Sequence, residues 1–289
     1  MFPEKVSGYA LKLANSSAAF RRQCFDPKKI EPDKTAYLDD PFGERASASR
    51  CKGVKQRFPD RVLIMTSSSC FMNCRHCTRR GLLADADVVR TPAELEAALD
   101  YVKSHPKVRD VLLSGGDIMT LGDDRVMEFV DAFSSLGQID MVRVCTRALA
   151  VDPARITAKL AKRLAKSGKV WVNTQFNCAD ELTPEAVEAA GRLIGSGIPV
   201  SSQSVLLKGV NDSGPKMLKL LKALSAARIR PYYVFLCDPV PGIEHFRVSA
   251  AKALEIERYC AERIGGLALP RFVADVPGAR RKIPVSTMV

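Results

Sequence analysis

The sequence predicts an α/β fold in which six parallel βα units form an open, partial (βα)6 TIM-like barrel. Short apolar runs rich in strand-forming residues recur along the chain, and segments with helical periodicity separate them. This alternation, repeated about six times, is typical of parallel strands joined by right-handed crossovers. A complete eight-fold barrel usually needs about 250 residues. Only about 230 of the 289 residues follow a predicted N-terminal extension, which favours six units.

The apolar runs define the predicted strands, and the first of them reads Arg61-Val-Leu-Ile-Met-Thr66. The six strands are expected at residues 61–66, 111–114, 140–146, 170–176, 198–206 and 229–237. Thr91 is placed as a helix N-cap, with Pro at the first helical position and Glu94 three residues after the cap. Asp152-Pro153 and Thr183-Pro184 are similar helix starts. Further helices are expected at residues 124–136, 215–227 and 249–263.

Two regions are expected along the chain. Residues 1–56 form an N-terminal extension that is mostly helical, with an amphipathic stretch at residues 9–22 and turn-rich segments at 26–34 and 39–46. Residues 57–289 form the barrel and a C-terminal segment. In barrels of this kind the chemistry lies at the C-terminal ends of the strands, so functional residues are sought there.

Composition narrows the class of protein. Lys and Arg number 44 against 32 Asp and Glu, and the net charge of +12 suits anionic ligands, nucleic acid among them, without naming one. No apolar run approaches the length needed to cross a bilayer, and the N-terminus lacks a secretory signal, so we expect a cytoplasmic protein without a membrane partner. Nine cysteines, an odd number, favour a reducing compartment with functional thiols.

Three of these cysteines form a C-x3-C-x2-C loop directly after the first predicted strand: Cys70, Cys74 and Cys77. Three thiolates can hold one [4Fe–4S] cluster and leave its fourth iron open to a small molecule. A zinc site would need a fourth ligand, and His76 is the nearest candidate. Its position inside the loop makes joint ligation awkward, which favours the cluster.

The loop resembles the signature of the radical S-adenosylmethionine (SAM) enzymes, and the chain as a whole resembles the lysine 2,3-aminomutase family. The resemblance covers residues 57–285, and the blocks that carry it, in order, are FPDRVLIMTSSSCFMNCRHCTRR, VRDVLLSGGD, VNTQFN, SQSVLLKGVND, RPYYVFLCD, GIEHFR and DVPGARRKIPV. It implies a cluster on the three cysteines, SAM on the open iron, and pyridoxal 5′-phosphate (PLP) as a second cofactor.

The resemblance also implies the residues that hold the cofactors. SAM is expected to contact Ser114, Gly115, Gly116, Asp117 and Gln175. Glycines let the backbone approach a ligand closely, although a tight strand-to-helix turn explains them equally well when they are taken alone. PLP is expected to be bound covalently to Lys282, the catalytic lysine, with Arg57, Arg61 and Gln203 around it. Guanidinium groups suit the phosphate, whereas surface ion pairs are the alternative for either arginine.

The substrate residues implied by the resemblance are Arg79, Asp238 and Asp275. Arg79 would bind the carboxylate of an amino acid, and the two aspartates would bind a distal ammonium. Paired carboxylates suit a terminal cation. Each aspartate precedes a proline or a turn, so a local capping role is the alternative.

The expected reaction is transfer of the 2-amino group of L-lysine to C3, giving β-lysine; arginine or an ornithine-like amino acid is an alternative substrate. The retained aspartates disfavour glutamate. A different class, a radical SAM enzyme that modifies RNA without PLP, predicts a clustered basic surface. A sensor without catalysis is a third class. Expected partners are a small-molecule amino acid, an electron donor such as flavodoxin or ferredoxin, and a second copy in a homodimer; nucleic acid is disfavoured.

Several positions depart from the family pattern. Gly278-Ala-Arg-Arg281 stands where the family has a run of glycines before the PLP lysine. Gln175 and Cys178 replace histidines, and Phe235 replaces a tyrosine. The chain ends at Val289, without the cysteine-bearing tail that binds zinc in longer relatives, so no zinc is expected.

Overall fold

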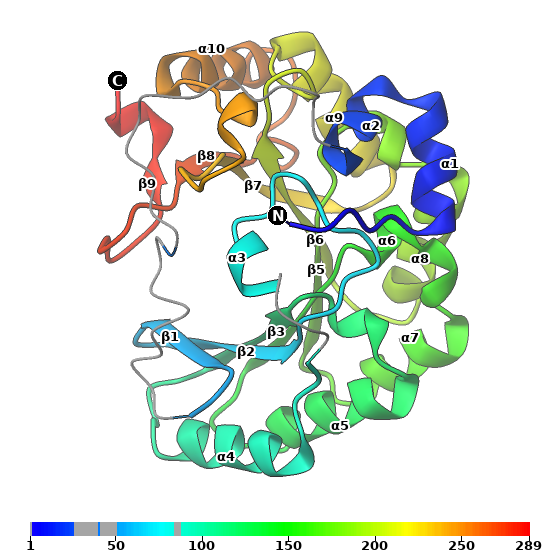
Figure 1. Cartoon of the computed structure of the whole chain (residues 1–289), viewed down its shortest axis with the longest axis vertical. Helices are drawn as coiled ribbons and strands as arrows, with labels where there is room; N and C mark the ends of the chain where they lie inside the picture. Colours follow the sequence, from blue (N-terminus) through cyan, green and yellow to red (C-terminus); the bar gives the residue numbers. More distant parts are fainter. Residues whose placement is uncertain (1, 26–39, 41–50, 84–87) are drawn as a thin grey trace.

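The computed structural model describes residues 2–25, 40, 51–83 and 88–289. In this part of the chain, nine strands form one sheet in chain order, and Figure 1 shows the sheet curled into an open barrel with helices on its outer side. The strands are β1 (Val54–Phe58), β2 (Arg61–Ser67), β3 (Asp110–Gly115), β4 (Met141–Cys145), β5 (Val170–Thr174), β6 (Val200–Leu206), β7 (Arg230–Leu236), β8 (Arg271–Ala274) and β9 (Ile283–Pro284).

The six predicted βα units are confirmed, because β2 to β7 run parallel and each is followed by at least one helix before the next strand. Strand β8 is a seventh parallel strand, paired with β7. The outer edges are antiparallel, with β1 on β2 and β9 on β8. The helices are α1 (Gly8–Ser16), α2 (Ala18–Cys24), α3 (Arg80–Leu83), α4 (Pro92–Lys103), α5 (Asp123–Ser134), α6 (Ala148–Val151), α7 (Ala158–Ala165), α8 (Pro184–Gly195), α9 (Gly214–Ala226) and α10 (Ala250–Ala261).

Helix starts follow the predicted capping chemistry with two exceptions. Thr91 caps α4 in a complete capping box with Glu94, as predicted. Asp152-Pro153, however, begins only a short 3-10 turn, and α7 starts later because the Thr157 hydroxyl accepts a hydrogen bond from the Leu160 amide at 3.1 Å. The amphipathic stretch 9–22 is two helices, since Ser17 is extended and caps α2.

The N-terminal extension is only partly described. Its two helices, α1 and α2, lie on the outer side of the barrel beside α6 and α9 in Figure 1. The turn-rich segments 26–34 and 39–46 fall almost wholly outside the described residues. Strand β1 crosses the boundary expected at residue 56, because it pairs with β2 as part of the sheet.

Alternate residues of each strand face opposite sides of the sheet, and only the outer side is purely apolar. On β3, Val111 and Leu113 are fully buried in the core beneath the helices. On the inner side, Arg143 of β4 donates from Nε and Nη2 to the two carboxylate oxygens of Asp110 at 3.0 and 2.6 Å. The inside of the barrel is therefore polar, as a site for charged ligands requires.

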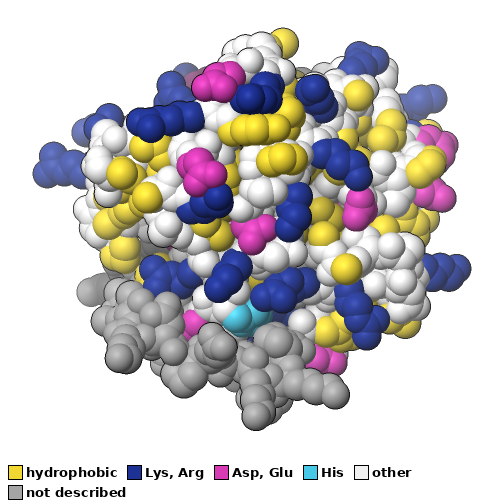
Figure 2. Space-filling view, turned by 90° about the horizontal axis from the view of Figure 1, so that it is seen from above, with side chains coloured by type: hydrophobic (Ala, Val, Ile, Leu, Met, Phe, Trp, Pro, Cys, Tyr) yellow, Lys and Arg dark blue, Asp and Glu magenta, His cyan; other side chains and the backbone are white. Residues whose placement is uncertain are grey.

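The excess positive charge is dispersed. On the face shown in Figure 2, Lys and Arg side chains lie among acidic and apolar ones. Several arginines are paired with carboxylates, among them Arg109 with Asp140 and Arg155 with Asp123. Within the described residues, no helix has the length and apolar character that a membrane span requires.

Candidate cofactor and substrate site

The cysteine loop begins where β2 ends, at the C-terminal edge of the parallel strands. Cys70, Cys74 and Cys77 are all half-buried and free of disulfides. Burial raises the pKa of the Cys77 thiol to about 11 and the pKa of Cys70 further still, and the charge of Cys74 adds to both shifts. The three thiols thus lie within electrostatic reach of one another. The raised pKa values favour the protonated thiols of Cys70 and Cys77, which must lose those protons to bind a metal.

The donor set fits a [4Fe–4S] cluster better than a single metal ion. Among the described residues, no three His, Cys, Asp or Glu side chains converge on one ion. A cluster presents a different iron to each thiolate, so convergence on one point is not required. The Nε2 of His76 is engaged by the amide nitrogens of Gln175 and Asn177 at 3.2 and 3.3 Å, and no three-ligand group in the described part of the chain includes this histidine.

The N-terminal segment holds the cysteine loop in place, a role that no sequence pattern indicated. Arg75, which is 1% exposed, donates from Nη1 to the carbonyl oxygens of Phe2 and Pro3 at 3.1 and 3.2 Å. The Asn73 amide donates to the Lys5 carbonyl at 2.8 Å. The loop that carries the thiols is therefore tied to residues some seventy positions earlier in the chain.

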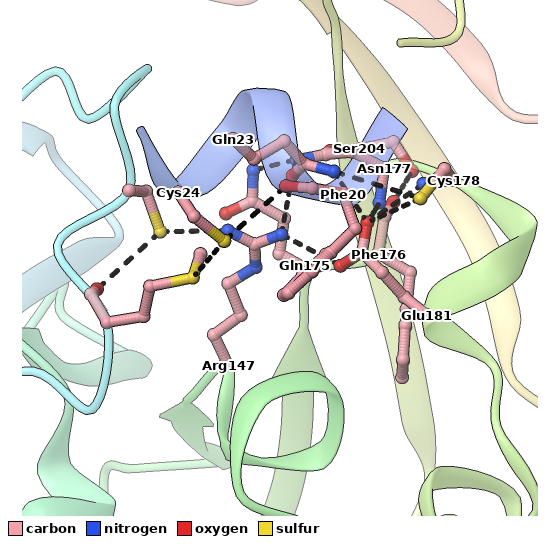
Figure 3. A network of polar contacts seen from close by, with 12 residues as sticks. Phe20, Gln23, Cys24, Arg147, Gln175, Phe176, Asn177, Cys178, Glu181 and Ser204 are labelled. Carbon is pink, nitrogen blue, oxygen red and sulfur yellow. Dashed lines mark hydrogen bonds and ion pairs between the residues drawn. The ribbon is translucent and has the colours of Figure 1, made fainter. Parts of the chain in front are cut away.

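A buried polar network lies behind the loop, and its centre is Arg147, at the end of β4 (Figure 3). Arg147 donates from Nη1 to Sγ of Cys74 at 2.8 Å. From Nη2 it donates to Oε1 of Gln23 on α2 at 2.6 Å and to Oε2 of Glu181 at 2.8 Å. Sequence reasoning missed this arginine, although its place directly after a parallel strand was a signal.

Two glycines at the end of β3 are required by packing. Gly115 has a φ of +112°, and a Cβ there would lie 2.5 Å from the Ser67 carbonyl oxygen. A Cβ on Gly116 would lie 2.2 Å from the carbonyl oxygen of Ser69. Both glycines thus bring β3 against the segment that leads into the cysteine loop. Their contact with SAM stays a prediction, beside this structural reason.

The remaining residues expected around SAM are already engaged in the fold. Burial raises the pKa of Asp117, whose two oxygens accept hydrogen bonds from the amides of Met119 at 3.0 Å and Arg147 at 2.8 Å. Its carboxylate therefore joins the ends of β3 and β4. The Ser114 carbonyl accepts from Thr66 at 3.0 Å, and Gln175 lies beside His76.

A second group of charges lies where the two edges of the barrel approach each other. Asp275, just after β8, accepts hydrogen bonds from Nη1 and Nη2 of Arg57 on β1, both at 3.0 Å. It also forms an ion pair with Lys282, just before β9. The Lys282 Nζ lies 5.6 and 5.4 Å from the ring centroids of Phe58 and Phe235. Burial lowers the pKa of Lys282, and Asp275 opposes that shift.

Asp238 belongs to the same group. Burial raises its pKa to about 7 and the charge of Asp275 adds to the shift, whereas Lys282, Arg57 and Arg79 oppose it. The structure therefore brings five of the predicted PLP and substrate residues within electrostatic reach of one another. Arg57, expected at the phosphate, is here bound to a carboxylate.

Two other predicted PLP residues have other hydrogen-bond partners, although the Arg61 guanidinium stays beside this group, with its Cζ 4.5 Å from the Phe58 ring that Lys282 also approaches. Arg61 donates from Nε to the neighbouring Asp60 at 3.1 Å and is 41% exposed, as in the surface-pair alternative. Gln203 accepts a hydrogen bond from the Tyr232 hydroxyl at 2.9 Å, and Asn173 donates to the same hydroxyl at 3.1 Å. Burial raises the pKa of Tyr232, so this hydroxyl keeps its proton.

The two arginines that replace the family's glycines lie in the connection between β8 and β9. Arg280 and Arg281 are both exposed, and Gly278 before them has a φ of +76° that favours glycine. Their side chains reach solvent, next in sequence to the half-buried Lys282.

Comparison with known proteins identifies the family. A family model described as the Radical SAM superfamily matches residues 64–221. Over 284 residues the chain is 41% identical to L-lysine 2,3-aminomutase of Acetoanaerobium sticklandii, covering 97% of this chain and 68% of that protein. Over 260 residues it is 35% identical to glutamate 2,3-aminomutase of Clostridioides difficile, covering 90% and 61%. The chain spans 64% of the length of L-lysine 2,3-aminomutase of Fusobacterium nucleatum and 55% of that of Bacillus subtilis.

Solved structures support the fold alone. Streptococcus suis SuiB bound to S-adenosylmethionine aligns with a TM-score of 0.57 at 17% sequence identity, covering 75% of this chain and 51% of that one. The radical SAM family implies a [4Fe–4S] cluster and SAM, and the three thiols after β2 fit that cluster. By sequence, this chain belongs to the lysine 2,3-aminomutase family of the radical SAM superfamily.

Proposed function

We propose that this protein is a SAM- and PLP-dependent radical aminomutase that moves the 2-amino group of L-lysine to C3, giving β-lysine. The observation that carries the proposal is the group formed by Asp238, Asp275, Lys282 and Arg79. Two carboxylates suit a terminal ammonium, a guanidinium suits the substrate carboxylate, and a half-buried lysine suits a carbonyl cofactor. These requirements belong to one small molecule rather than to a polymer.

The chemistry of the side chains indicates which residues would hold each cofactor. Cys70, Cys74 and Cys77 would hold the cluster, and Lys282 would hold PLP. When bound, the cluster and SAM supply a carbon radical, and PLP supplies a conjugated ring that makes nitrogen migration possible. The electron for SAM cleavage must come from outside the chain, from a donor such as flavodoxin or ferredoxin. The protein itself supplies position, charge and exclusion of water.

Lys282 must lose its ammonium proton before its nitrogen can bond to a carbonyl group. Burial already favours the neutral amine, whereas the ion pair with Asp275 holds the proton on Nζ. Loading of the lysine therefore has a second consequence: it frees one hydrogen-bond position on Oδ2 of Asp275, which Arg57 also contacts. Arg57 stays bound to that carboxylate through two hydrogen bonds and keeps it oriented toward an incoming cation.

Asp238 completes the cation site. With a pKa of about 7 it is only partly ionised in the free protein, because it is buried and faces Asp275. A substrate ammonium between the two carboxylates would favour the ionised form of both. An acidic side chain in that position would meet two negative charges, so glutamate is disfavoured. The guanidinium of arginine or the shorter cation of ornithine suits the same pair of carboxylates, which keeps both as alternative substrates.

The test is an anaerobic assay of the full chain reconstituted with iron, sulfide, PLP and SAM, with a chemical reductant. L-Lysine, L-arginine, L-ornithine and L-glutamate are supplied separately, and β-amino products are identified by mass spectrometry. We expect β-lysine from lysine and no product from glutamate. Borohydride treatment should fix PLP on Lys282, located by peptide mapping. Turnover of glutamate alone, or a PLP label on another residue, would contradict the proposal.

Two matched variants test the residue roles. Lys282→Arg keeps the charge next to Asp275 but cannot form a bond with a carbonyl group, so it should bind no PLP while its cluster spectrum stays intact. Asp238→Asn keeps the size of the side chain and removes its charge. This variant should raise KM for lysine far more than it changes the PLP absorbance, since the lost interaction is with the substrate.

A further inference from the structure

We propose that Arg147 is a positioning residue that sets the reduction potential of the [4Fe–4S] cluster through its hydrogen bond to Cys74. The Nη1–H donates to the Cys74 sulfur at 2.8 Å, a short distance for a donor to sulfur. The inference rests on the proposed cluster at the three cysteines. It does not depend on which amino acid the enzyme converts.

The guanidinium is held so that this contact persists. Nη2 donates to Gln23 at 2.6 Å and to Glu181 at 2.8 Å. Glu181 is fully buried, and its other oxygen accepts hydrogen bonds from the amides of Asn177 and Cys178, both at 2.9 Å. The carboxylate is thus fixed by backbone groups, and it fixes the arginine in turn. Figure 3 shows Arg147 reaching between α2 and the segment that carries Glu181.

The orientation of the amides in this network is settled by backbone groups as well. The Val205 amide donates to Oδ1 of Asn177 at 2.8 Å, so the nitrogen of that side chain must face Gln23 and His76. Oε1 of Gln23 accepts from both Asn177 and Arg147. Gln23, Asn177 and Glu181 therefore each have one orientation that matches these contacts, which favours a rigid network.

The contact is specific to one of the three cysteines. Over the described residues, no side-chain donor to the sulfur of Cys70 or Cys77 is found. A reduced cluster carries one more negative charge than an oxidised one, and hydrogen bonds to its sulfurs stabilise the reduced form. Arg147 and Glu181 together carry no net charge. The pair therefore affects the reduction potential through the hydrogen bond to the Cys74 sulfur, which is stronger when the cluster is reduced. Arg147 should therefore raise the potential, and Glu181 should moderate that effect.

Three variants separate these contributions. Arg147→Met with Glu181→Gln keeps the pair neutral but removes the hydrogen bond to Cys74. Glu181→Gln alone removes the opposing charge and keeps Arg147, which Gln23 still holds next to Cys74. The amide oxygen of the new side chain can still accept from the two backbone amides, whereas its amide nitrogen no longer accepts from Arg147. The control is Arg143→Met with Asp110→Asn, which neutralises another half-buried pair, at 14% and 20% exposure, inside the barrel.

The midpoint potential of each reconstituted full chain is measured by redox titration followed by electron paramagnetic resonance, without SAM or amino acid. For the neutral double variant we expect a decrease of about tenfold in the ratio of reduced to oxidised cluster at a fixed potential, the effect of one charge-assisted hydrogen bond. For a one-electron couple this is a shift of about 59 mV to lower potential. Glu181→Gln should shift the potential upward, and the control should match the wild type.

A double variant that holds its cluster at the wild-type potential would overturn the proposal. So would shifts of the same sign in the double variant and in Glu181→Gln, because a general disturbance of the fold predicts no opposition between them. If the double variant does not retain a cluster, Glu181→Gln decides alone: a potential that stays unchanged or falls rejects the role of Arg147. The wild-type cluster spectrum, recorded first, tests the proposed cluster site separately.

Discussion

Asp275 and Arg57 form a two-point ion pair across the opening of the barrel, with both Asp275 oxygens 3.0 Å from guanidinium nitrogens. Arg57 belongs to β1 and Asp275 follows β8, so the pair joins opposite edges of the sheet. The same carboxylate pairs with Lys282. The group proposed to bind substrate and PLP thus also connects the two edges of the sheet, which we call the seam of the barrel.

Arg57→Met should therefore destabilise the protein as well as impair PLP binding. The two side chains are 24% and 13% exposed, so the pair is only partly screened by water. We expect the free energy of unfolding to fall by about 1–3 kcal/mol, measured by urea denaturation of the free protein. The control is Arg109→Met. Arg109 also makes two hydrogen bonds to one carboxylate, that of Asp140, but this ion pair is well exposed. An equal loss in both variants would contradict a special role for the seam.

Asp238 should make stability depend on pH in an unusual direction. Its pKa is about 7 in the folded protein and 3.8 as an ordinary aspartate. Between these values the folded state holds a proton that the unfolded state releases, so the free energy of unfolding falls as pH rises from 4 to 7. The loss is complete about one pH unit above the folded-state pKa. It amounts to roughly 4 kcal/mol.

The measurement compares the wild type with Asp238→Asn by denaturation at several pH values between 4 and 8, without PLP. The asparagine has no proton to lose, so its stability curve should lack this decline. The variant should be the more stable protein at pH 8 and should approach the wild type near pH 4. Parallel curves for the two proteins would show that the carboxyl group titrates normally.

The fold was predictable because parallel βα units leave a repeated pattern in the sequence. Buried strands are apolar runs, and helices between them begin with caps such as Thr91 and Thr183. Strand β8 was missed because it is four residues long and is formed by pairing with β7 rather than by a strong local pattern. The break at Ser17 was missed because one hydroxyl, not periodicity, decides it.

The site was predictable where motifs carry it and not where distant segments meet. Resemblance indicated the cysteines and Lys282, which occupy defined positions in ordered blocks. It did not indicate that Gln23, Arg147 and Glu181 share one network, because these residues come from three separate elements and no local pattern links them. Nor could spacing show that Gly116 lies against the backbone of Ser69.

Gly116→Ala tests that packing directly. Its Cβ would lie 2.2 Å from the Ser69 carbonyl oxygen, so the segment leading into the cysteine loop would have to move. We expect a loss of about 2–4 kcal/mol in the free energy of unfolding and less iron per chain after reconstitution. Gly191→Ala is the control: it lies within α8 with no atom near the added Cβ, and should stabilise the helix by about 0.5–1 kcal/mol. Full iron content in Gly116→Ala would refute the close approach.

Arg75→Met tests whether the N-terminal segment supports the cluster site. The buried guanidinium donates to the carbonyls of Phe2 and Pro3, and without it the cysteine loop keeps the contacts of Asn73 with Pro3 and Lys5 but loses those of Arg75 to this segment. We expect less iron and sulfide per chain than in the wild type, together with a destabilisation of about 1–3 kcal/mol.

The matched control is Arg155→Met. Arg155 likewise donates to two backbone carbonyls, those of Met119 and Leu121, at 2.7 and 2.9 Å, but it lies outside the cysteine loop. Its loss should destabilise the protein to a similar degree and leave the iron content unchanged. Equal iron loss in both variants would mean that cluster retention follows global stability. Loss in Arg75→Met alone would show that the first residues of the chain hold the thiols in the geometry that the cluster needs.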